Sequence, residues 1–129
     1  MAHEFANRLQ PLGLRPPHFG VLTLIDAEPC RTQQELVERS MIDPSSMVSV
    51  IDELERLGLA QRRVDPSDRR KRAVHLTPRG RRMLERARAV AMQTAQDVLA
   101  PLDEKERQTL RALLRKLAGA EAEAPSARN

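Results

Sequence analysis

The residues with the clearest chemical potential are cations gathered in one part of the chain. Eleven of the 22 Lys and Arg residues lie between positions 62 and 88, where only three acidic residues stand, so this segment carries a net charge of about +8. The whole chain of 129 residues has a formal net charge of +4, so the remainder is acidic overall. A block of one sign in so small a protein predicts a polyanionic partner, because cations that neutralise phosphates release condensed counterions.

The strongest candidates within this block are Arg69, Arg70 and Lys71. They follow the turn-forming run Asp65-Pro66-Ser67-Asp68. Since strand candidates flank the run at 59–64 and 72–76, we expect a β-hairpin with residues 65–71 at its tip. A tip arginine is expected to enter the minor groove of DNA, and Asp68 is expected to orient the Arg70 guanidinium. An ordinary solvated turn is the alternative. General attraction to phosphates is expected from the neighbouring arginines, which are Arg62, Arg63, Arg72, Arg79, Arg81 and Arg82.

Hydroxyl side chains form a second candidate site at the start of a helix. Asp43-Pro44 predicts a helix start, with an acidic N-cap and proline in the first turn. Apolar residues then recur at steps of three and four until Gly58, which predicts the helix end. The residues that point away from this apolar stripe include Ser45, Ser46, Val48 and Ser49. Hydroxyls bind phosphates or base edges and valine contacts thymine methyl groups, so this helix is expected to read the major groove.

A short helix is expected just before it. Thr32-Gln33-Gln34-Glu35 has the pattern of a capping box, in which Thr and Glu satisfy each other's backbone donors. Two short helices joined by a few residues predict a helix-turn-helix. Gln33 and Gln34 are candidates for phosphate contact at the helix start, with plain solvent exposure as the alternative.

The remaining elements are helical. We expect helices over 1–13, from Arg15 to Pro29 and over 78–99, and a last helix that begins near Asp103. Residues 119–129 are expected to be a disordered tail, because they are rich in Ala, Glu, Pro and Ser. The predicted fold class is mainly α with a small β-hairpin wing (α+β), a winged helix-turn-helix with flanking helices.

Residues from about 14 to 84 resemble the MarR family of bacterial winged-helix regulators. The resemblance rests on five motifs: Thr32-Gln33-Gln34-Glu35-Leu36-Val37, Ser45-Ser46-Met47-Val48, Leu54-Glu55-Arg56-Leu57-Gly58-Leu59, Asp65-Pro66-Ser67-Asp68-Arg69-Arg70 and His75-Leu76-Thr77-Pro78-Arg79-Gly80. It implies a homodimer in which 1–13, here short, and 78–118 are dimerisation helices and 14–77 is the DNA-binding domain.

The resemblance also implies a transcriptional regulator, usually a repressor, whose DNA binding small aromatic or phenolic ligands weaken. The ligand pocket would then lie around Phe5, Arg15, His18 and Phe19. A dimer with two recognition helices is expected to bind a pseudo-palindromic duplex. The family often has basic residues where Pro44 and Ser49 stand here, so a sequence-neutral, nucleoid-type DNA-binding protein is the alternative. A second alternative is a winged helix that binds other proteins instead of DNA, but the concentration of positive charge in the hairpin argues against it.

Other classes of function lack support in the sequence. No glycine-rich phosphate loop or paired nucleophile and base predicts an enzyme, and no cofactor is expected. His3, His18 and His75 are not spaced as metal ligands, and Cys30 has no second cysteine to pair with. No apolar run approaches the roughly 20 residues that span a bilayer. Since the first residues also lack the layout of a signal peptide, the cytoplasm is the expected location.

Overall fold

The computed structural model describes residues 2–28 and 31–127, so Cys30 lies outside the described residues. The chain divides into two units, residues 1–93 and 94–129. The first unit contains, in chain order, α1 (Ala2–Leu9), the 3-10 helix η1 (Gln10–Leu12), α2 (Pro16–Ala27), β1 (Arg31–Thr32), α3 (Gln33–Glu38), α4 (Pro44–Arg56), β2 (Ala60–Asp65), β3 (Asp68–Leu76) and most of α5 (Pro78–Leu99). The second unit contains the end of α5 and α6 (Glu104–Ala127).

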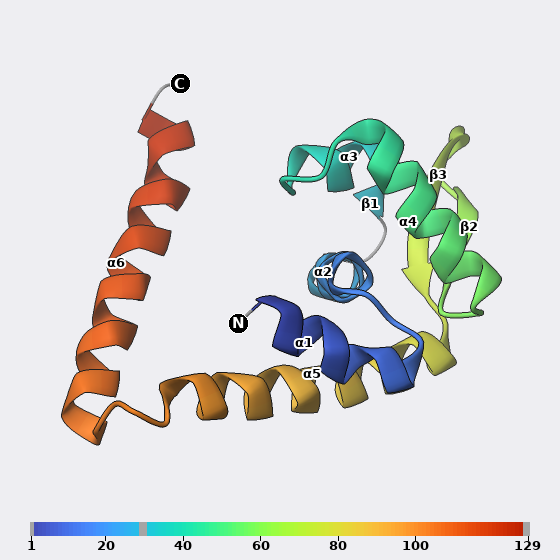
Figure 1. The fold of residues 1–129 in the computed structure, drawn as a ribbon. Helices are drawn as coiled ribbons and strands as arrows, with labels where there is room; N and C mark the ends of the chain where they lie inside the picture. Colours follow the sequence, from blue (N-terminus) through green and yellow to red (C-terminus); the bar gives the residue numbers. More distant parts are fainter. Residues whose placement is uncertain (1, 29–30, 128–129) are drawn as a thin grey trace. The chain divides into compact units, whose positions relative to one another are not determined.

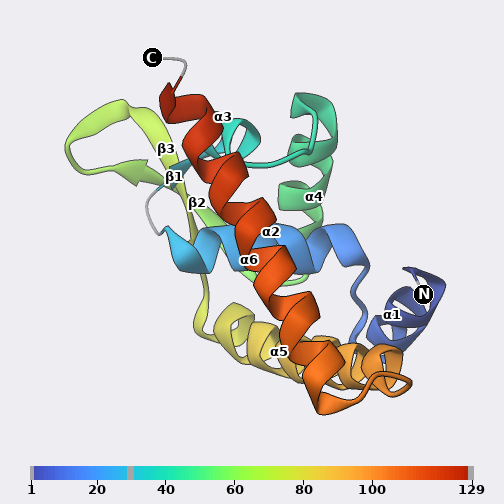
Figure 2. The same cartoon turned by 90° about the vertical axis from the view of Figure 1, so that its left-hand side faces the viewer.

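Helix α2 lies at the centre of the first unit. In both ribbon views it runs between α5 on one side and the layer of α3, α4 and the sheet on the other (Figures 1 and 2). Its side chains Leu22 and Ile25 are buried in the same core as Ile51 of α4 and Leu84 of α5. The predicted apolar stripe of α4 is confirmed, because Met47, Val50, Ile51 and Leu54 are all buried. Burial of this one face fixes which residues of α4 remain on the surface.

The hairpin is confirmed, but its tip is shorter than expected. The two hairpin strands pair antiparallel from Ala60 opposite Leu76 to Val64 opposite Arg72, and Asp65 then pairs with Asp68. The register shift between Val64 and Asp65 leaves residues 69–71 in a bulge of β3, and only Pro66 and Ser67 form the turn. The predicted seven-residue tip was therefore wrong, because Asp65 accepts hydrogen bonds from the backbone N–H and hydroxyl of Ser67 and tightens the turn.

A third strand was not predicted. Strand β1 has two residues, with Arg31 opposite Val74 and Thr32 opposite Ala73, so the sheet order is β1-β3-β2. Two residues are too few to show the alternation that predicts a strand. Since β1 directly precedes α3, this pairing connects the start of α3 to strand β3 of the wing.

The junction between the wing and α5 explains the Leu-Thr-Pro-x-Gly pattern. The Thr77 hydroxyl donates to the Gly58 carbonyl oxygen at 2.6 Å and accepts from the Gly80 backbone N–H at 2.9 Å. A Cβ atom on Gly80 would lie 1.9 Å from the carbonyl oxygen of Leu59, so a larger residue cannot fit without displacing the backbone. Gly58 has φ of +75°, a left-handed conformation that ends α4 as expected.

In the second unit, α6 begins with a capping box between Asp103 and Glu106. Leu113, Leu114 and Leu117 are each more than half exposed, so α6 has an uncovered apolar face. Helix α6 extends to Ala127, into the segment 119–129 that was expected to be a disordered tail. Ala and Glu, which dominate residues 118–124, favour helix.

Candidate nucleic-acid interface

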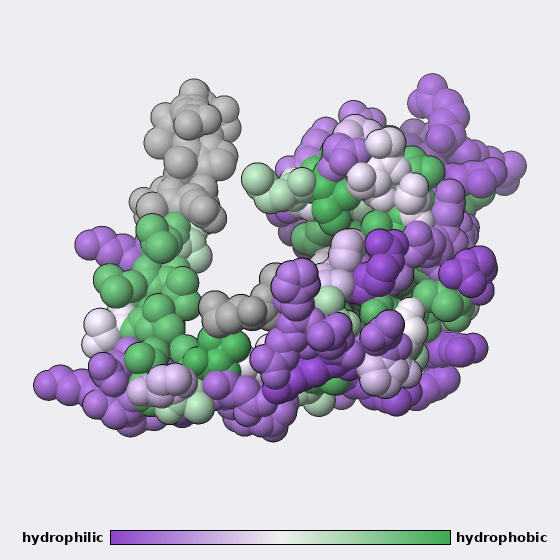
Figure 3. Space-filling view, in the orientation of Figure 1, coloured by the Kyte–Doolittle hydropathy of each residue, from purple (hydrophilic) through white to green (hydrophobic). Residues whose placement is uncertain are grey.

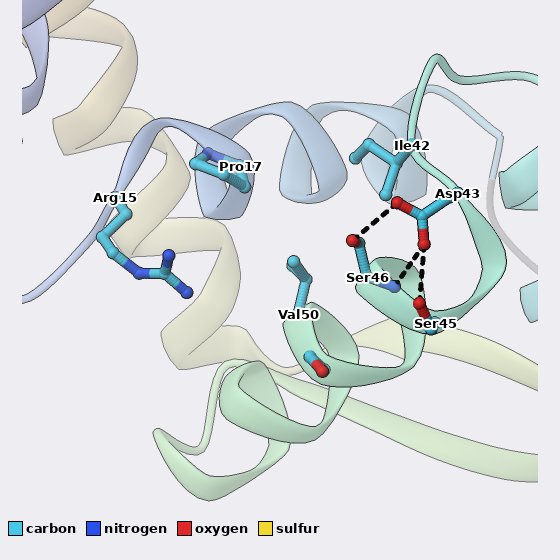
Figure 4. A pocket seen from close by; sticks show the side chains of 8 residues that line it. Arg15, Pro17, Ile42, Asp43, Ser45, Ser46 and Val50 are labelled. Carbon is cyan, nitrogen blue, oxygen red and sulfur yellow. Dashed lines mark hydrogen bonds between the residues drawn. The ribbon is translucent and has the colours of Figure 1, made fainter.

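The first turn of α4 displays hydroxyl groups around one carboxylate. Asp43 caps the helix: its Oδ1 accepts from the Ser46 backbone N–H at 2.9 Å and from the Ser45 hydroxyl at 2.8 Å, and its Oδ2 accepts from the Ser46 hydroxyl at 2.8 Å (Figure 4). These bonds, led by the Ser46 N–H, hold the pKa of Asp43 at about 2, below the usual 3.8. The Asp43 carboxylate is therefore ionised near neutral pH, and its hydrogen bonds order the first turn of α4.

The hydrogen bonds to Asp43 decide what the serines can offer a partner. Ser45 and Ser46 both donate their hydroxyl hydrogens to the cap, so their oxygen lone pairs remain available as acceptors. In the major groove, acceptors match the amino groups of cytosine and adenine. Ser49 is exposed one turn later, and Val48 is 39% exposed. The exposed start of α4 thus combines hydroxyl oxygens with one apolar side chain and no cation.

A pocket of about 460 Å³ lies beside this turn, where the start of α2 faces α4 (Figure 4). Its polar lining is Arg15, Asp43 and the three serines, and its apolar lining is Pro17, Ile42 and Val50. Four residues were candidates for ligand binding, and Arg15 is the one of them that lines this pocket.

The four ligand candidates form two separate pairs. The rings of Phe5 and Phe19 meet edge to face, with centroids 5.4 Å apart, and both pack against the core. Arg15 and His18 instead meet the carboxylate of Glu53 on α4: Arg15 Nη2 lies 2.8 and 3.0 Å from its two oxygens, and His18 Nε2 lies 2.6 Å from Oε2. These hydrogen bonds, Arg15's first, lower the pKa of Glu53. No sequence pattern predicts the contact with Glu53, since the partners are 35 and 38 positions apart.

The wing presents cations rather than hydroxyls. Arg69, Lys71 and Arg72 are exposed, and none of them forms an ion pair with a described residue. The side chain of Arg70 is 92% exposed, and Asp68 Oδ1 lies 3.0 Å from its backbone N and 3.3 Å from its Nε. This is the contact expected between Asp68 and Arg70. In the space-filling view the hairpin end is a projecting hydrophilic surface (Figure 3).

A groove joins the wing to the start of α3. It has a volume of about 510 Å³, with Gln33, Gln34, Glu35 and Glu38 on the helix side and Arg70, Lys71 and Arg72 on the wing side. The Thr32–Glu35 capping box is confirmed by reciprocal bonds. Gln34 is exposed, whereas Gln33 is half-buried and accepts a hydrogen bond from Arg62. Both glutamines therefore lie near the wing cations, in different environments.

Other kinds of site have little basis in the described residues. Over 2–28 and 31–127, no group of three His, Cys, Asp or Glu side chains is arranged to hold a metal ion. None of the helices described is both long and apolar enough to cross a membrane. What remains is a helix-turn-helix, α3 and α4, followed directly by a cationic hairpin, and this arrangement defines a winged-helix DNA-binding domain.

The comparisons with known proteins identify the family. Residues 12–71 match the model of the MarR family. The transcriptional regulatory protein assigned to the hcr operon of Thauera aromatica is 37% identical over 88% of this chain and 69% of its own length. The HTH-type transcriptional repressor Rv2887 of Mycobacterium tuberculosis is 32% identical over 88% of this chain and 82% of its own length.

Solved structures agree. CouR, a transcriptional repressor bound to a 23-mer DNA duplex, is 34% identical with a TM-score of 0.79 over 91% of this chain and 83% of that chain. Rv2887 in complex with p-aminosalicylic acid is 31% identical with a TM-score of 0.78 over 91% of this chain and 88% of that chain. The chain belongs to the MarR family, and it is a winged-helix transcriptional regulator.

Proposed function

We propose that this protein represses transcription by binding a pseudo-palindromic DNA duplex as a homodimer, and that a small aromatic or phenolic ligand releases it. The observation that carries the proposal is the joint exposure of two chemically different surfaces in one compact unit. The wing offers Arg69, Arg70, Lys71 and Arg72, and the start of α4 offers Ser45, Ser46, Val48 and Ser49. In this proposal the cations bind phosphates and the minor groove, and α4 reads the major groove.

The apolar face of α6 supports dimerisation. Leu113, Leu114 and Leu117 lie on one side of the helix and are 54–63% exposed. In the space-filling view this part of α6 is a continuous hydrophobic surface (Figure 3). A contiguous apolar surface of this kind is typical of a protein–protein interface. A second copy of α6 would cover it and set the spacing of two recognition helices.

Release by a ligand is supported by relatives. Rv2887 has been solved with p-aminosalicylic acid and with salicylic acid, both of them aromatic carboxylates. In this chain the candidates for such a ligand remain Phe5, Arg15, His18 and Phe19. Salicylate added to the protein–duplex complex is expected to lower the bound fraction. An unchanged bound fraction at millimolar salicylate would remove this class of ligand from the proposal.

We further propose that the protein acts by binding alone, without catalytic turnover, in the cytoplasm, where a bacterial regulator meets the chromosome. The family is one of transcriptional regulators. The non-enzymatic function would be overturned if the purified protein cleaved or modified the duplexes that it binds.

Selection of bound duplexes from a random pool, at two salt concentrations, tests DNA recognition. We expect a common pseudo-palindrome whose half-site centres lie about 10 base pairs apart. Competition by random duplex is expected to be at least about 10³-fold weaker than competition by the selected site. If random and selected duplexes compete equally at both salt concentrations, the protein is the sequence-neutral binder that the missing cations at Pro44 and Ser49 suggest.

A further inference from the structure

Arg62, on β2, is set apart from the other cations of the basic segment by its contacts. Its Nη1 donates to Asp52 Oδ1 at 2.7 Å and to Glu55 Oε1, and its Nη2 donates to Gln33 Oε1 at 2.8 Å. Its backbone N–H donates to Glu55 Oε2 at 3.2 Å. One side chain thus connects the first strand of the wing to both helices of the helix-turn-helix.

Burial and charge argue against a direct role for Arg62 in binding phosphate. The Arg62 side chain is 20% exposed, whereas that of Arg70 is 92% exposed. Two carboxylates flank the one guanidinium, so the cluster of Arg62, Asp52 and Glu55 has a net charge of −1. A phosphate that approached this cluster would meet the carboxylates as well as the cation. Sequence analysis grouped Arg62 with cations that attract phosphate, and the structure assigns it different partners.

The bond to Gln33 has a chemical consequence. A guanidinium group only donates hydrogen bonds, so the amide group of Gln33 must turn its oxygen toward Arg62. The amide nitrogen, with its two N–H groups, is then the end that remains for a partner. Gln33 also lines the groove that has Glu35 and Glu38 on its own side and Arg70, Lys71 and Arg72 on the opposite wall, so the groove has a net charge of +1. Phosphate oxygens only accept hydrogen bonds, so this orientation suits a phosphate in that groove.

We propose that Arg62 is a positioning residue for DNA binding: it holds Gln33 as a hydrogen-bond donor toward a phosphate and fixes α3 against α4 and the wing, without touching DNA. The inference rests on the proposed function, since it assumes that this face binds a duplex. It separates the basic segment into two kinds of arginine. Those of the bulge contact DNA, and Arg62 orients a residue that does.

The slope of log affinity against log salt concentration distinguishes positioning from contact. Each phosphate contact that is lost lowers the slope by about 0.9. For Arg62→Gln we expect the affinity for the selected palindrome to fall about tenfold, with the slope of the native protein retained. A fall in slope of about two for the dimer would mean that each Arg62 binds a phosphate, and it would overturn the proposal. Arg63→Gln, at an exposed position on the same strand, is the matched control for the lost charge.

A double-mutant cycle tests the orientation of Gln33. Gln33→Glu keeps an oxygen for Arg62 but replaces the amide N–H groups with a second oxygen, so affinity is expected to fall at least about tenfold. In the Arg62→Gln background the amide is no longer oriented, and the same substitution is expected to cost at least threefold less, a coupling typical of residues in contact. Gln34→Glu introduces the same charge at the neighbouring position, which has no bond to Arg62. Its effect on DNA affinity should therefore be equal in the native and the Arg62→Gln backgrounds. Additive effects at Gln33 would overturn the proposal.

An NMR measurement on the free protein tests the orientation of Gln33 without DNA and also shows whether the Arg62 variant is folded. In the free protein, the side-chain amide resonances of Gln33 are expected to move toward those of exposed glutamines when Arg62 becomes Gln. Unchanged resonances in a folded variant would contradict the orientation of Gln33 by Arg62. If the native protein bound no duplex at all, the proposed function would fail. If the native protein binds the duplex but Arg62→Gln lowers the salt slope or acts additively with Gln33→Glu, only the inference about Arg62 is overturned.

Discussion

The start of α4 and the bulge of the wing are both exposed, yet they are built on opposite principles. At α4 the polar groups satisfy one another, because Asp43 accepts hydrogen bonds from both serines that follow it. In the bulge the cations have few partners: Arg69, Lys71 and Arg72 form no ion pair within the described residues, and Arg70 has only Asp68. Unpaired cations supply affinity that does not depend on sequence, whereas fixed acceptors supply selectivity. In the proposed function we therefore expect affinity to come mainly from the wing and selectivity mainly from the start of α4.

The largest loss of DNA affinity is expected when the homodimer is separated into monomers. Leu113→Asp with Leu117→Asp places charges on the apolar face of α6, and the resulting monomer brings one α4 and one wing to a half-site. Since a second linked site multiplies affinity by 10² to 10⁴, we expect a loss of about 10³-fold on the palindrome. Analytical ultracentrifugation and a mobility-shift titration would measure both changes. The control Glu104→Gln, at an exposed position of the same helix, should change neither the oligomeric state nor the affinity. If the double leucine variant stays dimeric, α6 is not the dimer interface.

Removal of the wing cations should come next. Arg69→Ala with Arg70→Ala is expected to lower affinity about 100-fold for palindrome and random duplex alike, and to reduce the salt slope. Arg82→Ala with Arg86→Ala removes the same charge from exposed positions of α5 and should have a much smaller effect. If the palindrome loses affinity while random duplex does not, the wing reads sequence and the division between the two regions is wrong.

The serines of α4 should behave in the opposite way. Ser45→Ala, Ser46→Ala and Ser49→Ala together are expected to weaken binding of the palindrome at least about tenfold, which is what the loss of one or two hydrogen bonds of about 1 kcal/mol each would cause. The affinity for random duplex and the salt slope should stay as they are. Competition titrations with both duplexes would reveal the change, and an equal loss on both would identify the serines as phosphate contacts.

The smallest effect is expected on the stability of the protein at acidic pH. Because hydrogen bonds lower the pKa of Asp43 in the folded protein to about 2, the cap contributes stability that is fully present above pH 4 and is lost as the pH falls through about 2. Asp43→Asn removes this titration, so its difference in Tm from the native protein should shrink between pH 5 and pH 2.5. Thermal unfolding followed by circular dichroism would detect it. A difference that is constant over this range would mean that Asp43 titrates normally.

Local rules of sequence predicted the elements well where the chemistry is local. The capping residues Thr32 and Asp43 and the glycine at 58 predicted helix ends correctly, because each acts on backbone groups within a few residues. The bulge was missed because the run of cations looks like a loop, whereas pairing with β2 keeps Asp68 and Arg72 in the strand. Strand β1 exists only through its pairing with β3.

The contacts between residues of the candidate site were not predicted, and the role of its residues in DNA binding stays a prediction. Arg15 with Glu53, and Arg62 with Gln33, join positions that are 38 and 29 apart. No periodic pattern or short motif connects such positions, so these contacts follow only from how the helices pack. Sequence analysis therefore identified which side chains are exposed more reliably than which exposed side chains are held in place.

The close approach of Gly80 to Leu59 has a mechanical consequence. The Leu59 carbonyl oxygen accepts a hydrogen bond from Thr77 N–H at 3.0 Å, and it would lie 1.9 Å from any Cβ atom on Gly80. The first turn of α5 and the root of the hairpin are therefore in direct backbone contact. We expect a tilt of that turn to displace the base of the wing as well, so that the distance between two wings on a duplex would change with the orientation of α5.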